Sequence, residues 1–86
     1  MNALIAPQQK SLLITNWVLA NGVYKPVVEP IPNSARVCEV AEVAFEVAPP
    51  LFWVACADDV IADQYWYNTV DKAVNKINNA PYPQLP

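Results

Sequence analysis

The prolines constrain this chain more than any other feature, because nine of them are spread along 86 residues that contain only one glycine. Proline fixes φ and has no amide hydrogen, so it breaks helix interiors and is tolerated in turns and at sheet edges. The nine positions are Pro7, Pro26, Pro30, Pro32, Pro49, Pro50, Pro81, Pro83 and Pro86. Most of the segments between them are too short for a typical packed helix. We therefore expect a chain built from short β-strands.

The dipeptide Asn21-Gly22 separates two segments that are rich in β-branched and aromatic residues. Residues 12–18 read LLITNWV, and residues 23–28 read VYKPVV. Asn-Gly suits a two-residue type I′ turn, in which both central residues need a positive φ. The pattern predicts a β-hairpin.

Residues 35–47 alternate between apolar and polar side chains, which fits one or two half-buried strands. A helix is the alternative, because four apolar residues have the spacing of a helical stripe: Val37, Val40, Ala41 and Ala44. The density of valine and the Pro49-Pro50 pair that closes the segment favour strands.

Three further segments complete the pattern. Residues 50–56 form a continuous apolar run, as expected of a strand covered on both faces. Residues 64–77 are expected to form a strand, a turn and a strand, with a helix over 70–78 capped by Thr69 as the alternative. Residues 79–86 contain three prolines and should be extended, resting on this subunit or reaching for a neighbour.

These segments predict an all-β fold, a small antiparallel β-hairpin sandwich or barrel-like domain with extended, proline-rich termini. The length fits a single domain of modest stability. We expect an extended N-terminal arm over residues 1–10, a β-rich domain over residues 11–78 and an extended tail over residues 79–86. Both termini are expected to clamp neighbouring subunits, because extended segments commonly dock on sheet edges.

The composition favours a protein with a partner. Charged residues make up 15% of the chain, against about 25% in ordinary soluble domains, and hydrophobic residues make up 55%. Exposed apolar patches usually mark interaction sites, so another subunit is expected to cover part of the surface. The net charge is −3 and the five basic residues are scattered, which disfavours nucleic-acid binding. The sequence also has no apolar run of bilayer length and no recognisable leader, so we expect a soluble protein without a membrane partner.

The two cysteines, Cys38 and Cys56, have a spacing that fits neither a CxxC redox motif nor a zinc site, and the chain has no histidine. A catalytic thiol needs a base, and the apolar neighbours of Cys56 would raise its pKa. We expect two buried, reduced thiols; a single disulfide is the alternative.

Asp58, Asp59 and Asp63 form the only acidic cluster. They would suit a hard cation or acid–base chemistry, but their spacing lacks the central glycine and alternating ligands of a calcium loop. Aspartates next to strand ends more often accept backbone N–H groups in turns. We therefore expect no metal, no cofactor and no catalytic residue.

The aromatic residues and the tail supply the candidate interface. Trp and Tyr are the residues most enriched as interface anchors. In a strand, Tyr65 and Tyr67 share one face and Trp66 takes the other; the pattern leaves open which face is exposed. The residues expected at a protein interface are Trp17, Trp66, Tyr67, Tyr82 and Leu85.

Three stretches carry a resemblance to a known group of proteins: NSARVCEV, FEVAPPLFWVACADDVIADQYWYNT and DKAVNKI. The chain resembles small proteins of tailed bacteriophages over roughly residues 33–72. That group shares an F-x-V-A-x-P-L-F-W-V-x-C core, then D-D-V-x-A-D and an aromatic Y-Y-D-T strand. Asn68 stands where the group tends to have Asp, and the motifs carry no established catalytic residues.

The resemblance implies a non-enzymatic structural component of a virion, made in the host cytoplasm. The leading expectation is a capsid decoration, cement or minor capsid protein that docks on neighbouring subunits. Self-association is also expected. A tail or fibre-associated protein, or a free regulatory binding protein in the host cytoplasm, is the alternative.

Overall fold

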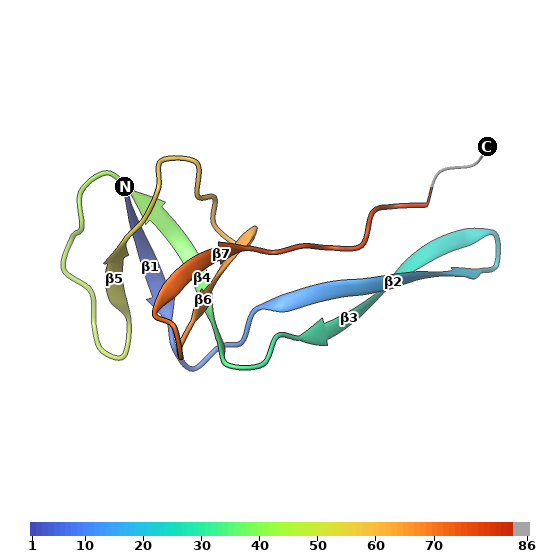
Figure 1. Ribbon diagram of the computed structural model, residues 1–86, viewed down its shortest axis with the longest axis horizontal. Coiled ribbons are helices and arrows are strands. Elements are labelled where there is room, and N and C mark those ends of the chain that lie inside the picture. The colour runs from blue at the N-terminus through green and yellow to red at the C-terminus, as the bar shows by residue number, and fades with distance from the viewer. Residues whose placement is uncertain (84–86) are drawn as a thin grey trace.

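The computed structural model describes residues 1–83, which form seven β-strands and no helix (Figure 1). The strands are β1 (Asn2–Ala6), β2 (Leu12–Ala20), β3 (Val23–Pro30), β4 (Ser34–Ala41), β5 (Phe52–Ala55), β6 (Tyr65–Asn68) and β7 (Ala73–Lys76). Five of them form an antiparallel sheet in the order β5-β1-β4-β6-β7, which curls into a half-barrel, and β2 and β3 form a separate hairpin. The predicted all-β fold is confirmed. Within residues 1–83, no helix is long and apolar enough to cross a membrane.

The N-terminal residues are part of the sheet, and the predicted arm over residues 1–10 is wrong. Residues 2–6 form β1, which pairs with β4 on one side and β5 on the other. Ala3 and Ile5 are completely buried. The physical reason is that a run of apolar residues with strands on both sides buries its side chains and satisfies its backbone at the same time.

The core lies on the inner face of the half-barrel. Its fully enclosed members include Ile5 of β1 and Val37 of β4. Tyr67 of β6 belongs to the same cluster, and its ring meets Phe52 of β5 edge to face at a centroid distance of 5.7 Å. Val60, from the loop before β6, also packs into this cluster. The curl thus brings β5, at one edge of the sheet, close to β6, the strand next to the other edge, around one small core.

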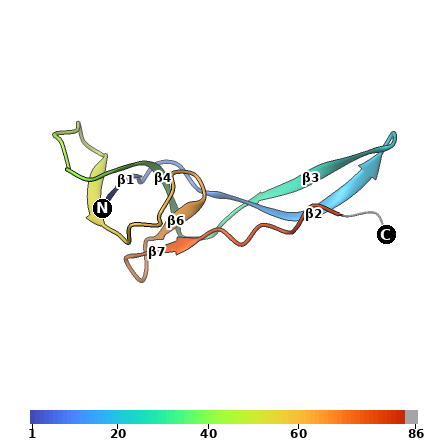
Figure 2. The same ribbon diagram turned by 90° about the horizontal axis from the view of Figure 1, so that it is seen from above.

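The hairpin of β2 and β3 projects from the half-barrel (Figures 1 and 2). The predicted turn is confirmed, because φ is 52° at Asn21 and 79° at Gly22, as a type I′ turn requires. The molecule measures 47 × 23 × 22 Å. Its radius of gyration is 15.0 Å, against about 12 Å for a compact domain of this length. The excess comes from the projecting hairpin.

The remaining segments follow the predictions in part. Residues 34–41 form β4, so the strand is confirmed over its first half only, and residues 42–51 form a loop. The strand–turn–strand prediction for residues 64–77 is confirmed by β6 and β7, and no helix forms over residues 70–78. In the turn, the Asn68 side chain accepts hydrogen bonds from two following backbone N–H groups.

β5 is an edge strand, and the prediction of a strand covered on both faces is wrong. Phe52 and Ala55 are exposed, while Trp53 and Val54 are half-buried. The apolar run is explained by the loop beside the strand. The Trp53 indole donates a hydrogen bond of 2.7 Å to the backbone oxygen of Phe45, and the two rings pack edge to face.

Candidate functional site

The hairpin exposes more apolar side chains than any other element, so it is the candidate interaction site. Cross-strand partners in a hairpin point to the same face, and successive residues alternate between faces. The pairing of β2 with β3 therefore defines two faces. The first, called the strap face, carries Leu12, Ile14, Trp17, Leu19, Tyr24, Pro26, Val28 and Pro30. The second, called the open face, carries Leu13, Asn16, Val18, Ala20, Val23, Lys25, Val27 and Glu29.

Residues 78–83, called the strap, run beside β2 toward the tip of the hairpin (Figures 1 and 2). Three hydrogen bonds hold the strap there. The Ala80 amide donates to the Ile14 carbonyl (2.8 Å), the Ile14 amide donates to Oδ1 of Asn79 (2.8 Å), and the Trp17 indole donates to the Ala80 carbonyl (2.9 Å). The strap thus occupies the outer edge of β2.

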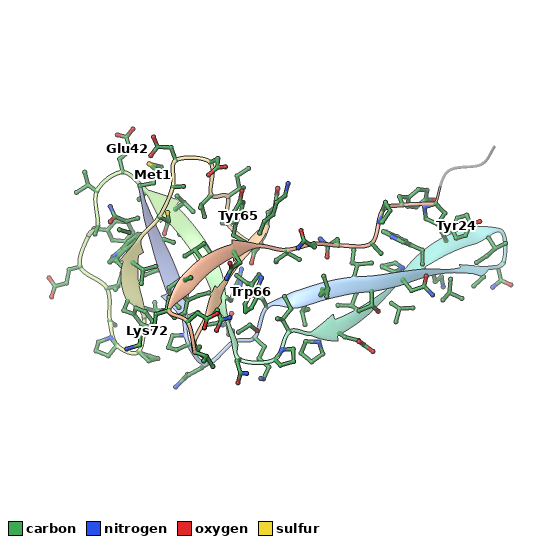
Figure 3. All side chains as sticks on the ribbon, viewed as in Figure 1. Met1, Tyr24, Glu42, Tyr65, Trp66 and Lys72 are labelled. Carbon is green, nitrogen blue, oxygen red and sulfur yellow. The ribbon has the colours of Figure 1, made fainter. Side chains whose placement is uncertain are left out.

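The end of the strap folds over the strap face. The Tyr82 ring lies edge to face with the Trp17 ring at 4.9 Å and with the Tyr24 ring at 5.9 Å. Figure 3 shows Tyr24 near the tip of the hairpin, close to the end of the described chain. Residues 79–82 therefore contact this subunit's own hairpin, the first of the two placements expected for the tail.

The outer edge of β3 offers few backbone donors. The amide and carbonyl of Ile14 point to the strap, so Ile14 and its partner Val28 are a pair whose backbone groups point away from each other. Pro26 and Pro30 lie two residues on either side of Val28 and share its orientation. Both lack an amide hydrogen, so alternate donors are missing along this edge. Prolines of this kind protect an edge from pairing with another strand.

The apolar residues at the two ends of the strap face and along the open face stay uncovered. Leu12 and Leu19 on the strap face are 58% and 59% exposed. Val18 and Val23 on the open face are 48% and 58% exposed. Valine and leucine at this exposure on a projecting two-stranded element are typical of a surface that a protein partner covers.

The predicted interface residues differ in position and burial. Trp17 is half-buried beneath Tyr82, which is itself 58% exposed. Trp66 is half-buried on the face of β6 opposite Tyr67, and it belongs to the half-barrel and not to the hairpin (Figure 3). Tyr67 is only 8% exposed and belongs to the core, so its predicted role as an interface anchor is wrong. Leu85 lies outside the described residues. Alternation placed Tyr67 and Trp66 on opposite faces, but only the curl of the sheet decides that the tyrosine face is the inner one.

The sequence-based prediction did not include the apolar tip and flanks of the hairpin as an interaction site. A usable signal was present, because residues 18–20 and 23–28 carry hydrophobic side chains on both faces of a two-stranded element. One hairpin has no second layer to bury both faces.

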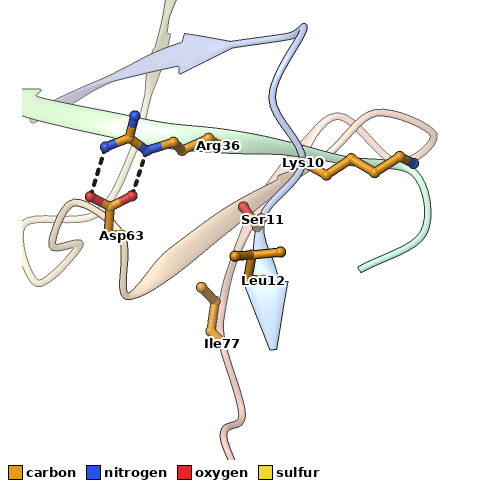
Figure 4. A pocket seen from close by; sticks show the side chains of 6 residues that line it. All are labelled: Lys10, Ser11, Leu12, Arg36, Asp63 and Ile77. Carbon is orange, nitrogen blue, oxygen red and sulfur yellow. Dashed lines mark hydrogen bonds and ion pairs between the residues drawn. The ribbon is translucent and has the colours of Figure 1, made fainter. Parts of the chain in front are cut away.

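A hollow of about 230 Å³ lies where the hairpin joins the half-barrel (Figure 4). Its lining residues are Lys10, Ser11, Leu12, Arg36, Asp63 and Ile77. Its central feature is an ion pair in which Nε and Nη2 of Arg36 donate to the two carboxylate oxygens of Asp63 at 2.7 and 3.0 Å. Nη1 of Arg36 donates to the Gln9 side chain at 2.9 Å. These contacts tie β4 to the loop before β6 and to the turn after β1.

The ion pair stabilises the charged form of both groups. Hydrogen bonds from Arg36 lower the pKa of the Asp63 carboxyl, and the same hydrogen bonds raise the pKa of the Arg36 guanidinium. Ser11 donates its hydroxyl hydrogen to the Ala35 carbonyl. A carboxylate held in its ionised form and a hydroxyl bonded to the backbone suit a structural junction better than proton transfer.

The acidic cluster predicted from the sequence is dispersed. Asp63 has a φ of 63° and binds Arg36, so its carboxylate goes to a side chain rather than to the backbone N–H expected in a turn. Asp58 is 96% exposed, 3.5 Å from the amino group of Met1. Among residues 1–83 no three acidic or cysteine side chains come close enough to hold a metal ion.

The thiols of Cys38 and Cys56 are both free and half-buried, so they are less enclosed than predicted. The Cys38 sulfur donates to the Leu4 carbonyl at 3.4 Å. Burial raises the pKa of the Cys56 thiol, which lowers its thiolate fraction at neutral pH.

Comparison of the chain with known protein families, with curated proteins and with solved structures finds no match. The arguments for an interaction site therefore rest on the chain's own residues. Its most distinctive surface is the projecting hairpin with two apolar faces.

Proposed function

We propose that this protein is a non-enzymatic structural component of a tailed bacteriophage virion, a capsid decoration or minor capsid protein that docks on neighbouring subunits through its hairpin. The observation that carries the docking role is the hairpin itself, which projects from the half-barrel and exposes apolar side chains on both faces. The phage context rests on the resemblance of residues 33–72 to small virion proteins. The proposed partners are other virion proteins and copies of this chain, in a particle assembled in the host cytoplasm.

The energetics favour a part that is stabilised by its partners. The half-barrel core is small, with Ile5 and Val37 as its largest fully buried side chains. Binding to the folded state alone adds stability by mass action, so docking would compensate for a small core. Covering Leu12, Leu19 and Val28 would also remove apolar surface from water.

Mass spectrometry of purified particles tests the proposal directly. We expect the chain at a fixed stoichiometry to the major virion proteins, and its location in a particle map then separates capsid from tail. Absence from particles, with the protein free in the lysate, would contradict the proposal and favour the regulatory binding protein.

A substitution at the hairpin tests the docking surface. Leu19→Lys places a charge on the exposed part of the strap face, and we expect particle occupancy to fall at least about tenfold. The matched control is Val70→Lys, because Val70 is 68% exposed in the turn between β6 and β7, which belongs to the half-barrel. Equal occupancy for the two variants would show that the hairpin does not dock.

A further inference from the structure

The open face carries a charge pattern that matches a second copy of itself. Lys25 and Glu29 are exposed, lie on the same face of β3 and are four residues apart, or about 13 Å along the strand. Neither has an ion-pair partner within residues 1–83. Val27 lies midway between them, opposite Asn16 on β2. A basic and an acidic residue therefore flank the Val27–Asn16 pair symmetrically.

We propose that two copies of this chain associate face to face through their open faces, related by a two-fold axis that lies between the two faces, above the Val27–Asn16 pair, in the plane of the interface and perpendicular to the strands. This inference deepens the docking role of the hairpin, on which it rests, and it does not depend on the virion context. A two-fold axis makes the same surface patch contact itself, as in most homodimers.

The axis places complementary residues opposite each other. It reverses the strand direction, so Lys25 faces the partner's Glu29 and Glu29 faces the partner's Lys25. On β2 the same operation sets Val18, the cross-strand partner of Lys25, opposite the partner's Leu13, the cross-strand partner of Glu29. Two ion pairs thus flank an apolar contact.

The alternative axis, parallel to the strands, is disfavoured on two counts. It would bring Lys25 to the same level along the strands as the partner's Lys25, and Glu29 to the level of the partner's Glu29, and like charges placed close together are destabilising. It would also place both half-barrels at the same end of the assembly. The two half-barrels would then have to fit side by side around hairpins that pack about 10 Å apart, although the whole molecule is 22 Å across its narrowest dimension. The perpendicular axis puts them at opposite ends.

The other surfaces of the hairpin are less suited to this contact. The strap lies along the outer edge of β2, and Tyr82 covers the middle of the strap face. Along the outer edge of β3, Pro26 and Pro30 remove the donors that edge-to-edge pairing needs. The open face combines the exposed valines Val18, Val23 and Val27 with charges of both signs that have no ion-pair partner within residues 1–83.

Charge reversal tests the inference, with self-association measured by sedimentation equilibrium over a concentration series. We expect the wild-type chain to dimerise, and Lys25→Glu and Glu29→Lys each to weaken dimerisation at least about tenfold, because each replaces two attractive contacts with two repulsive ones. The double variant Lys25→Glu/Glu29→Lys should restore dimerisation. An equimolar mixture of the two single variants should also associate, since both contacts in the mixed dimer pair opposite charges.

The matched control is Lys76→Glu, which reverses an exposed charge on β7 and should leave dimerisation unchanged. Zero-length crosslinking with a carbodiimide provides a second readout, since a Lys25–Glu29 crosslink can form only between copies when the two residues are about 13 Å apart in one chain. A wild-type chain that stays monomeric up to about 1 mM would overturn the inference. So would a dimer that the single reversals do not weaken, or that the double variant does not restore. Dimerisation of the isolated chain is independent of particle occupancy, so failure here and failure of the virion proposal are distinguishable.

Discussion

At the scale of single residues, the Arg36–Asp63 pair joins three parts of the chain. Arg36 lies on β4, Asp63 precedes β6, and Gln9 lies in the turn between β1 and β2. The side chains of Arg36 and Asp63 are 40% and 56% exposed, so solvent screening limits what the pair contributes to stability. Its main effect is to hold the junction between the half-barrel and the hairpin in one geometry.

The pair predicts a pH dependence of stability. The pKa of Asp63 is lower in the folded protein than its ordinary value of 3.8, so folding favours the ionised carboxylate. Its contribution is fully present above about pH 4 and is lost as the pH falls through the lower, folded-state pKa. Asp63→Asn should lower the free energy of unfolding by at most about 1 kcal/mol at pH 7, and the difference from wild type should shrink toward zero in strong acid.

Urea unfolding of wild type and Asp63→Asn between neutral and acidic pH measures this dependence. Asparagine also tolerates the left-handed backbone conformation that Asp63 adopts, so the substitution removes the charge without adding strain. Asp59→Asn serves as the control, because Asp59 is an exposed neighbour in the same loop. A difference between Asp63→Asn and wild type that persists unchanged into acid would show that the ion pair is not its source.

At the scale of elements, the strap adds a third segment to the two-stranded hairpin, along the outer edge of β2. A two-stranded hairpin is marginally stable alone in water. The strap adds hydrogen bonds to Ile14 and Trp17 and an aromatic cluster with Tyr82 at its centre. Ile77, which is 8% exposed, anchors the start of the strap at the junction.

Removing residues 79–86 should expose Trp17 while the half-barrel stays folded, because β1 and β4–β7 lie outside the deleted segment. The expected result is a red shift of Trp17 fluorescence in a background where Trp53 and Trp66 are replaced by phenylalanine. Removing residues 84–86 alone is the control, since it keeps all the contacts described for the strap. A truncated chain whose Trp17 emission matches that of the control would contradict the role of the strap.

At the scale of the whole molecule, stability is divided unevenly between two parts. β1 pairs with β4 on one side and β5 on the other, and its residues Ala3 and Ile5 are completely buried. The hairpin has exposed residues along most of its length. Local opening is expected where buried apolar contacts are few.

Hydrogen exchange should reveal this division. In the Lys25→Glu variant, designed to suppress dimerisation, we expect the amides that pair β2 with β3 to exchange at least about tenfold faster than those that pair β1 with β4. Two-dimensional NMR in D2O measures both sets of amides. Equal protection of the two sets would show that the molecule opens as a single cooperative unit.

Short-range sequence patterns determined the β2–β3 hairpin and the β6–β7 strand pair. Asn21-Gly22 specified the turn because few residues adopt two successive positive φ values. The alternation of Tyr65, Trp66 and Tyr67 likewise specified a strand with two unlike faces. Both features depend on neighbours in the chain, and they emerge from the sequence without knowledge of the rest of the molecule.

Long-range pairing decided what those patterns left open. Only the tertiary structure places residues 2–6 between β4 and β5, places β5 at an edge and points the Tyr67 side chain into the core. The docking of residues 79–82 on β2 is a contact of the same kind. The physical reason is that a strand carries the same local pattern whether it lies at the centre or the edge of a sheet. Which strands become its neighbours depends on the burial and backbone pairing of the whole chain at once.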